Sequence, residues 1–580
     1  MKLLFLALLP CAASQDQQPS GFPGLPAGRA PRVEIPWNRL YDVDEIYAHL
    51  DRLVAAYPDL LSMEIIGYSV ENRELRVYTL NDAATGPDEE KPAMWVDGNV
   101  HGNEVQGGEG VVYLAWYLLE NHGSNARVTA LVEGSAFYLL PMVNPDGRAN
   151  WFREAHTASS SRSGVMPLDR DGDGLFDEDG PDDLDGDGEI TQMRKHVPGE
   201  GTHRLNADDP RILERVPADT RGAPGDWIYL GQEGLDNDGD GRINEDSLGG
   251  YDMNRAWPAL WQPDHVQYGA GPYPLYWPET RCIARFLLEH PNVAAVQSYH
   301  NAGGMILRGP GAEAFGEYPR ADVAVYDELG RDGERMLPFY RYMIIWKDLY
   351  SVFGGFVNWT YEGLGIMSFT NELWTDDRES PDGRLRGVEG GRHWFDDHLL
   401  MSAGFVDWKP HEHPLYGSIE IGGFKKDVGR VPPSFLIEEM LHRNAAFCLS
   451  HALAMPRVSI HEPVVTDLGA GVKAIDVLLE NEHLIPTRTA LAVEKKIGVP
   501  DLVLLEGEGI EVLAGGWRSD RFRPEALELQ EHEPARLVRD RGIGSRDELR
   551  VRWIVRGSGE ATVRFRAEKA RDVARGFTVQ

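Results

Sequence analysis

The sequence predicts an α/β layered domain followed by an all-β sandwich domain. Helical and extended patterns of apolar residues alternate from about residue 36 to 456. After Pro456 the pattern changes to short strands separated by turns. At 580 residues the chain is several times longer than a typical domain, so a division into two or more domains is expected.

The N-terminal residues predict export. Lys2 precedes an apolar run over residues 3–9, and small residues follow that run. This order is typical of a secretory signal peptide, so we expect residues 1–14 to be removed and the chain to be secreted or periplasmic. Residues 15–35, rich in Gln, Pro and Gly, predict a flexible leader.

The amino-acid composition argues against two classes of binding partner. The formal net charge of −34 argues against nucleic acid and anionic membrane surfaces, because phosphate binding needs clustered Lys and Arg. After the signal segment no stretch is apolar for long enough to span a bilayer. Beyond that segment the cysteines are Cys282 and Cys448, which favours buried free thiols, with a single bridge between them left open.

The first elements of the α/β domain follow the leader. Asp42 and Glu45 resemble a capping box and predict the start of a helix. Residues 63–80 predict two strands that meet near residues 71–73. The following elements alternate in type: strand 93–96, helix 107–121, strand 136–143, helix 279–289, strands 293–299 and 365–370, and helix 433–454.

Two regions depart from this alternation. Residues from about 157 to 250 are acidic, rich in glycine and poor in apolar periodicity, which predicts an insertion. In residues 457–580 a strand is expected at 472–479. Leu549, Val551 and Trp553 should face Val563, Phe565 and Ala567 across the turn at 557–559. Nothing catalytic stands out there, so a spacer or docking role with an unknown partner is expected.

A histidine and a glutamate mark the junction between the predicted strand 93–96 and helix 107–121. His101 and Glu104 are three residues apart, so an imidazole nitrogen and a carboxylate can converge on one cation. An isolated pair of this kind is more often structural, so its meaning depends on the rest of the chain. Ligand sites of layered α/β domains lie at the carboxyl ends of strands, and Asn144, His300 and Glu372 also closely follow strand-like runs.

Further motifs make the chain similar to a known family. These are Asn144-Pro145-Asp146-Gly147, Asp252-Met253-Asn254-Arg255, Ser298-Tyr299-His300-Asn301, Tyr350, Gly354-Gly355, Val357 to Tyr361 and Ser368 to Leu373. From about Val43 to Pro456, without the insertion, the chain resembles the M14 zinc metallocarboxypeptidases, of the carboxypeptidase A and B type. The resemblance implies a mixed central sheet flanked by helices.

The resemblance also implies the chemistry of the site. His101, Glu104 and His300 would bind one catalytic Zn²⁺ and leave one position open for water. Glu372 would act as the general base that takes the proton of this water and passes it to the leaving amine. Asp252 would accept a hydrogen bond from His101 and fix the nitrogen that faces the metal.

The substrate-binding residues are implied in the same way. Asn254 and Arg255 resemble the pair that holds the terminal carboxylate of the substrate, and Tyr350 resembles the mobile tyrosine that closes over it. Arg194, in Met193-Arg194-Lys195, best matches the arginine that stabilises the oxyanion, with Arg153 as a competitor. Val357 falls at the base of the pocket for the terminal side chain, which predicts release of neutral, apolar or aromatic residues.

Three Asp-x-Asp-x-Asp-Gly repeats lie in the predicted insertion. Their carboxylates are Asp169, Asp171 and Asp173, then Asp183, Asp185 and Asp187, then Asp236, Asp238 and Asp240. Alternating carboxylates before a glycine turn are how a hard cation gathers oxygen ligands, so the repeats favour Ca²⁺ over solvated loops. The twelfth position lacks the usual glutamate, although Asp179 and Asp246 stand one residue earlier, so binding is expected to be weak or shared between loops. Bound cations should order the chain that continues into Asp252.

The sequence thus predicts an exported zinc-dependent carboxypeptidase acting on peptides or proteins with a free C-terminus. A second hypothesis keeps the metal chemistry but takes cell-wall peptides or another acyl-amino acid as substrate. A third, from a different class, is a non-catalytic calcium-dependent binding protein on the same fold. It requires a missing ligand or base, and none is missing from the sequence.

Overall fold

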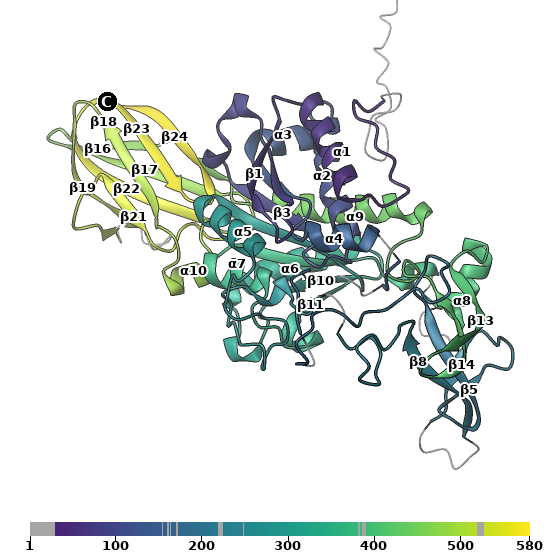
Figure 1. Ribbon diagram of the computed structural model, residues 1–580. Coiled ribbons are helices and arrows are strands. Elements are labelled where there is room, and N and C mark those ends of the chain that lie inside the picture. Colours follow the sequence, from purple (N-terminus) through teal and green to yellow (C-terminus); the bar gives the residue numbers. More distant parts are fainter. Residues whose placement is uncertain are drawn as a thin grey trace, which may run out of the picture.

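The chain forms three parts in space, which Figure 1 shows as a central sheet with helices, a β lobe at the lower right and a β sandwich at the upper left. The computed structural model describes residues 30–580, apart from 154, 159–161, 163, 170–171, 218–223, 247–248, 381–382, 386–389 and 519–526. The predicted signal peptide and most of the leader lie outside these residues. No helix among the described residues has the length and apolar character needed to cross a membrane.

An eight-stranded sheet forms the centre of the α/β part, in the order β1-β2-β4-β3-β9-β12-β10-β11. Its strands are β1 (Leu61–Tyr68), β2 (Glu74–Leu80), β3 (Ala93–Gly98), β4 (Ala136–Leu140), β9 (Val293–Asn301), β10 (Met305–Arg308), β11 (Arg341–Ile344) and β12 (Met367–Leu373). The run β4-β3-β9-β12 is parallel, whereas the pairs β1-β2, β2-β4 and β10-β12 are antiparallel. The predicted mixed sheet is therefore confirmed.

Helices pack on both faces of this sheet. They are α1 (Val43–Ala56), α2 (Gln106–Asn121), α3 (Ala126–Gly134), α4 (Pro145–Arg153), α5 (Pro278–Glu289), α6 (Arg320–Met336), α7 (Phe356–Leu364) and α9 (Ser434–Leu453). Met94 and Val96 of β3 join an apolar cluster with α1, α2, α6 and α9, whereas Ala93 and Trp95 join another with α5 and α7. Because successive strand residues point to opposite faces, the two clusters are the cores on either side of the sheet.

The start of α2 lies unusually close to the sheet. A Cβ atom on Gly107 would lie 2.8 Å from the backbone nitrogen of Asn99 and 2.9 Å from the carbonyl oxygen of Tyr299. A Cβ atom on Gly98 would lie 2.4 Å from the backbone of Gly107. Only glycine permits this approach of helix and strand backbones, and it brings the segment 101–104 against the end of β9.

A buried ion pair ties α4 to α2. Both side chains of Arg148 and Glu109 are fully buried, with Nη2 of the arginine 2.6 Å from Oε1 of the glutamate. Arg148 also donates to the carbonyl oxygens of Tyr41 and Val105. Removing one partner of such a pair leaves an uncompensated buried charge and two carbonyl groups without their donor.

We therefore expect Arg148→Met to lower the free energy of unfolding by about 3–5 kcal/mol. Arg39→Met removes a half-exposed arginine that pairs with Glu45 and should cost at most about 1 kcal/mol. Chemical denaturation of both variants and the parent chain measures the difference. Equal losses in the two variants would contradict a special contribution from the buried pair.

The predicted insertion folds into the β lobe together with a distant part of the chain. The lobe contains β5 (Gln192–Gly201), β6 (His203–Leu205), β7 (Leu213–Arg215), β8 (Gly225–Gln232), α8 (Gly391–Phe395), β13 (Phe405–His413) and β14 (Gly417–Phe424). Its sheet has the order β13-β14-β5-β8-β6-β7. The hairpin β13-β14 was not predicted, because its strands are largely polar and half-exposed and give no clear alternation.

The C-terminal part is built from two antiparallel sheets, in the orders β15-β17-β22-β19-β20, with β16 beside β17, and β21-β18-β23-β24. The elements are β15 (Val458–Ile460), β16 (Val464–Gly469), β17 (Val472–Asn481), α10 (Ala490–Lys495), β18 (Asp501–Gly507), β19 (Ile510–Arg518), β20 (Leu527–Leu529), β21 (Arg536–Arg539), β22 (Glu548–Gly557), β23 (Gly559–Ala567) and β24 (Ala570–Val579). The turn at 557–559 leads from one sheet to the other. Trp553 and Phe565 therefore meet in one apolar core instead of pairing in one sheet.

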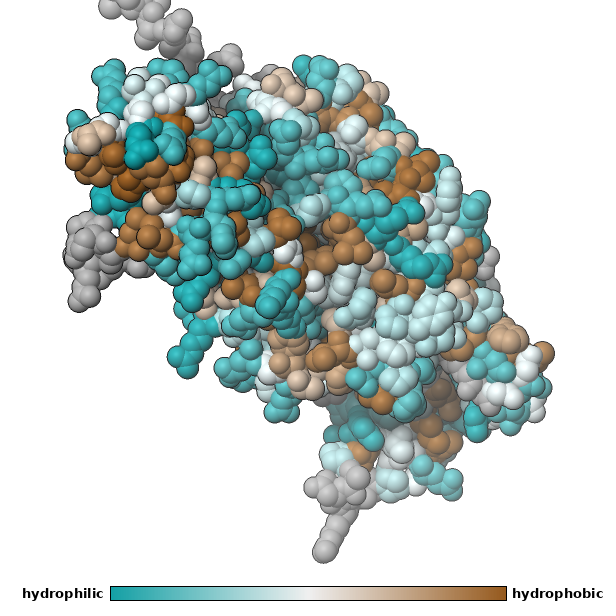
Figure 2. Space-filling model, turned by 90° about the vertical axis from the view of Figure 1, so that its left-hand side faces the viewer, coloured by the Kyte–Doolittle hydropathy of each residue, from teal (hydrophilic) through white to brown (hydrophobic). Residues whose placement is uncertain are grey.

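One face of the molecule carries hydrophilic and apolar residues side by side (Figure 2), and the two cysteines are free thiols. Figure 2, which faces the β-sandwich end of the molecule, shows hydrophilic residues interspersed with small groups of apolar ones. Cys282 and Cys448 are free, and Cys448 is buried. The bridge between them that the sequence left open is therefore absent.

Candidate active site

The predicted metal ligands and the predicted base meet at the carboxyl ends of three neighbouring parallel strands. His101 and Glu104 follow the end of β3, His300 lies near the end of β9, and Glu372 lies near the end of β12. In the register of β9 and β12, Glu372 pairs with His300. The parallel part of the sheet thus brings together four residues from three segments that are far apart in the sequence.

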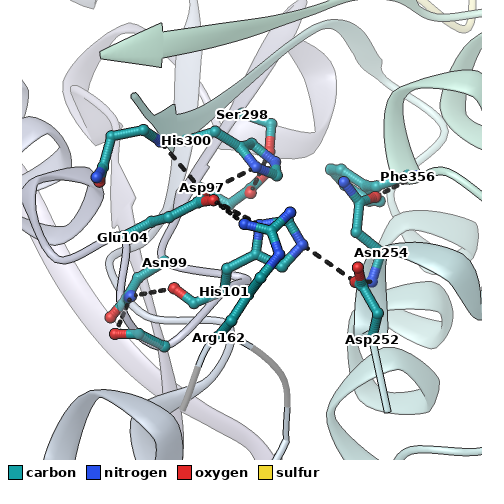
Figure 3. A network of polar contacts seen from close by, with 12 residues as sticks. Asp97, Asn99, His101, Glu104, Arg162, Asp252, Asn254, Ser298, His300 and Phe356 are labelled. Atoms are coloured by element: carbon teal, nitrogen blue, oxygen red, sulfur yellow. Dashed lines mark hydrogen bonds and ion pairs between the residues drawn. The ribbon is translucent and has the colours of Figure 1, made fainter. Parts of the chain in front are cut away.

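Two histidines face one carboxylate in this place (Figure 3). Nδ1 of His101 lies 2.8 Å from Oε1 of Glu104, and Nδ1 of His300 lies 3.0 Å from Oε2. The three side chains are buried, and one ligand atom from each lies within 4.8 Å of the others. Nitrogen and oxygen donors at this spacing can all reach one zinc ion at about 2.0–2.2 Å, so the residues fit the predicted metal.

The electrostatics of Glu104 favour the ionised form, which binds metal. Burial alone would raise the pKa of Glu104, but the two histidines outweigh burial and hold this pKa well below its usual value. Glu104 is therefore a carboxylate in the neutral range of pH. A carboxylate next to imidazole nitrogens is the charge state that a divalent cation requires.

Asp252 orients His101 from the other side. Its Oδ1 lies 3.1 Å from Nε2 of His101 and accepts a hydrogen bond of 2.7 Å from the backbone nitrogen of Asn254. Burial opposes ionisation of Asp252, but Arg255 and His101 more than compensate, and its pKa is strongly lowered. An ionised acceptor on Nε2 leaves Nδ1 of His101 free to face the metal position.

Two of the predicted substrate-binding residues, Asn254 and Arg255, lie on the short 3₁₀ turn Met253–Arg255. Oδ1 of Asn254 accepts a hydrogen bond of 2.8 Å from the backbone nitrogen of Phe356 at the start of α7, which fixes the direction of its amide. Nη1 of Arg255 donates to the carbonyl oxygen of Asn254 over 2.9 Å. Both residues line the same cavity as the three metal-binding candidates.

Arg194 is not among the residues that line this cavity, which argues against its predicted catalytic role. It belongs to β5 in the β lobe, where its Nε lies 2.7 Å from Glu420 and its guanidinium lies over the rings of Trp227 and Trp408. These contacts give Arg194 a structural role in the lobe. The competing Arg153 lies at the end of α4 and is not among the cavity residues either.

Two other arginines, which the sequence did not indicate, reach the cavity instead. Nη1 of Arg162 lies 2.7 Å from Oε1 of Glu104, and Nη2 of Arg430 lies 3.8 Å from the same atom. Burial alone would lower the pKa of Arg162, but Glu104 and Asp252 raise it, so this guanidinium is charged. Arg162 stands in a serine-rich segment and Arg430 in a loop before α9, and neither is part of a spacing motif that could have revealed it.

The cavity itself has a volume of about 280 Å³. Its wall away from the metal-binding candidates is mainly apolar and includes Leu307, Ile345, Val352, Phe356 and Val357. Its charged lining residues are Glu104, Arg162, Arg255, Glu372 and Arg430, all of which belong to the site described above. The described wall around Val357 therefore offers contacts for an apolar side chain.

Glu372 and Tyr350 complete the cavity. Burial raises the pKa of Glu372, and the neighbouring Glu104 raises it further. A carboxylate with a raised pKa accepts and returns a proton more readily near neutral pH than an ordinary glutamate. Tyr350 follows the π-helix Ile345–Leu349, and 56% of its surface is exposed, so it stands at the mouth of the cavity.

The three acidic repeats form turns of the same kind. In each repeat the first aspartate accepts hydrogen bonds from the backbone nitrogens of the two glycines: Asp169 from Gly172 and Gly174, Asp183 from Gly186 and Gly188, and Asp236 from Gly239 and Gly241. Asp171 lies outside the described residues. Calcium binding by the repeats stays a prediction.

Comparisons with known proteins agree with the location of this site. A family model described as zinc carboxypeptidase matches residues 46–173 and 229–387. A second model, described as a domain of unknown function (DUF8731), matches residues 457–578. The matched parts of the first model carry the metal-binding candidates, Glu372 and Arg162, and they leave residues 174–228 of the β lobe outside.

Individual relatives match parts of the chain. Carboxypeptidase D of Mus musculus is 36% identical over 126 residues, which cover 22% of this chain but only 9% of that protein. Carboxypeptidase A1 of Rattus norvegicus is 23% identical over 345 residues, covering 57% of this chain and 62% of that protein. The crystal structure of carboxypeptidase A from Helicoverpa armigera matches at 17% identity and a TM-score of 0.41, covering 64% of this chain and 78% of that one.

Proposed function

This chain belongs to the zinc carboxypeptidase family, and we propose that it is an exported enzyme that hydrolyses the C-terminal peptide bond of peptides or proteins. The observation that carries this proposal is the meeting, in one cavity, of the group His101, Glu104 and His300 with Glu372 and Arg255. Export rests on the N-terminal sequence pattern alone and stays a prediction.

The three converging side chains would hold the zinc ion. When bound there, zinc supplies Lewis-acid polarisation of the scissile carbonyl group and of a water molecule. The contribution of the protein is to hold two imidazoles and one carboxylate in fixed directions. Asp252 does this for His101, and the strand β9 does it for His300.

Glu372 would move the proton. Its carboxylate lies in the cavity next to the metal-binding candidates, and its raised pKa suits a group that first accepts a proton from water and then donates it to the leaving amine. The position on β12, which pairs with β9, keeps this carboxylate on a rigid strand. The same group then serves both halves of the reaction.

The cationic side chains would recognise charge on the substrate. A guanidinium binds a carboxylate through two parallel hydrogen bonds, so Arg255 with Asn254 favours a chain end over an internal peptide. Arg162, which lies beside Glu104, would stabilise the negative charge that develops on the carbonyl oxygen. Tyr350, at the mouth of the cavity, would close over the bound chain end.

Hydrolysis of matched peptides tests the proposal. A peptide with a free C-terminus should lose single residues from that end, and mass spectrometry identifies them. The same peptide with an amidated C-terminus should be cleaved at least about 100-fold more slowly, because the amide cannot pair with Arg255. Cleavage of both peptides at equal rates, or at internal bonds, would exclude an exopeptidase of this type.

The apolar wall predicts which residue is released. For peptides that end in Phe or Leu, kcat/KM should exceed that for Lys or Glu by at least about tenfold, since a charged side chain would be buried without a partner. Val357→Asp would place a carboxylate in the wall and should shift the preference towards Lys. A parent enzyme that prefers Lys would show that a residue outside the described wall sets the charge of the pocket.

A further inference from the structure

We propose that the first and third acidic repeats share one Ca²⁺ site, held by Asp179, Asp238 and Glu245. One carboxylate oxygen from each residue lies within 4.8 Å of the others. Of the two arrangements that the sequence left open, an ion within each loop or one shared between loops, the geometry favours the shared one. It joins two segments that are far apart in the chain.

The backbone already pairs the two repeats. Asp179 and Asp246 form an antiparallel bridge, and both residues are fully buried. Asp179 follows Asp169, and Asp246 follows Asp236, at the same spacing, so the bridge joins equivalent positions of the first and third repeats. This pairing brings Asp179 of the first repeat beside Asp238 and Glu245 of the third.

Buried oxygen atoms point to a ligand at this place. Oδ2 of Asp179 and both carboxylate oxygens of Glu245 are inaccessible to solvent and have no hydrogen-bond partner among the described residues. Asp179 has no exposed surface, and its other oxygen accepts a hydrogen bond of 3.2 Å from Nδ2 of Asn237. Buried carboxylates without donors are costly unless a cation or a proton lies between them.

The second repeat provides an internal comparison. There, Nζ of Lys409 lies 4.0 Å from Asp185 and 3.9 Å from Asp187, and Lys425 lies 4.0 Å from Glu189. Among the described residues, no Lys or Arg forms an ion pair with Asp179, Asp238 or Glu245. The second repeat thus has protein cations beside its carboxylates, whereas no Lys or Arg among the described residues neutralises the carboxylates shared by the other two.

The chemistry of the ligands selects Ca²⁺. The site offers three carboxylates, so all its ligand atoms are oxygens. Ca²⁺ accepts six to eight such ligands in flexible geometry, whereas Mg²⁺ demands a tighter octahedron. Carboxylates contributed by two loops suit the larger ion.

The position of the site links it to the active site. The segment before the first repeat carries Arg162, and the segment after the third carries Asp252 to Arg255. These segments run together, since the backbone nitrogen of Gly164 donates to the carbonyl oxygen of Tyr251 over 3.3 Å. A cation that joins the two repeats would hold these two segments together. It would thereby fix the positions of Arg162 and Arg255, which line the cavity.

Calorimetric titration of the full chain, loaded with zinc and freed of calcium, tests the site with CaCl₂ as the probe. Glu245→Gln and Asp179→Asn should each weaken Ca²⁺ binding at least about tenfold, because each removes one charged ligand. Asp208→Asn removes an exposed charge from the same lobe outside the cluster and should leave the affinity unchanged. Ca²⁺ should also raise the melting temperature of the parent chain but not that of Glu245→Gln.

Three other outcomes would contradict the proposed Ca²⁺ site. Absence of Ca²⁺ binding by the parent chain, with a melting temperature that rises as the pH falls, would show a shared proton in place of a cation. Binding that survives both substitutions would place the ion in the separate loops. Tighter binding of MgCl₂ than of CaCl₂ would contradict the choice of ion.

The kinetic consequence rests on the proposed function and is measured separately. Removal of Ca²⁺ should raise KM for a peptide with a free C-terminus while the zinc content stays constant. An inactive enzyme that still binds Ca²⁺ through Glu245 would refute the proposed function and leave the cation site standing. An active enzyme that does not bind Ca²⁺ through Glu245 would refute the cation site and leave the proposed function standing.

Discussion

Glu372→Gln is expected to lower kcat by about 10³- to 10⁴-fold while the zinc content stays that of the parent enzyme. General acid–base catalysis typically contributes about 10²- to 10⁴-fold, and we expect the upper part of this range because one carboxylate serves two proton transfers. The amide keeps the shape of the side chain but cannot accept a proton. Glu372 is not among the three metal-binding candidates, so the ion should remain.

Glu362→Gln is the matched control for this variant. Glu362 is a buried glutamate on α7 that accepts a hydrogen bond of 2.9 Å from Tyr318 and does not line the cavity. Its substitution also removes one buried carboxylate, but kcat should stay within about threefold of the parent value, because no reacting atom is near. Metal analysis, melting temperature and kcat are measured for both variants. Near-normal turnover by Glu372→Gln would remove Glu372 as the base.

The central sheet and the metal-binding candidates could be predicted from the sequence because local signals coincide there. The predicted helices 107–121, 279–289 and 433–454 each agree with the observed bounds to within one residue. Buried parallel strands are short apolar runs, and the residues that follow them meet at one edge of the sheet by topology alone. His101, His300 and Glu372 are therefore near one another for reasons that the sequence already contains.

The β lobe and the arginines of the cavity could not be predicted in the same way. The lobe is completed by β14, which pairs with β5 across more than 200 residues of chain, and its polar strands carry no clear alternation. Arg194 matches a local motif, but the lobe draws it to Glu420, away from the cavity. Arg162 reaches the cavity because its segment returns to the sheet, where the nitrogen of Gly102 donates to its carbonyl oxygen over 2.9 Å.

The second prediction with a large expected effect follows from assigning stabilisation of the oxyanion to Arg162 instead of Arg194. Arg162→Ala should lower kcat/KM by about 10²- to 10³-fold, mainly through kcat, because a fixed donor aimed at a developing oxyanion acts in the transition state and little in the ground state. The substitution also removes the ion pair with Glu104, so zinc content is measured beside the rate constants. Arg162→Lys keeps the positive charge but lacks the planar set of N–H donors of the guanidinium group. It should therefore recover only part of the kcat/KM that Arg162→Ala loses.

Arg194→Ala is the matched control, since it removes the arginine that the motif favoured. Loss of its contacts with Glu420, Trp227 and Trp408 should lower the melting temperature of the β lobe while kcat/KM stays within about threefold of the parent value. Arg430→Ala is measured in parallel because Arg430 is the other cation near Glu104, at 3.8 Å. A larger loss of kcat in Arg430→Ala than in Arg162→Ala would assign the oxyanion to Arg430. A loss confined to Arg194→Ala would require the β lobe to close onto the cavity during the reaction.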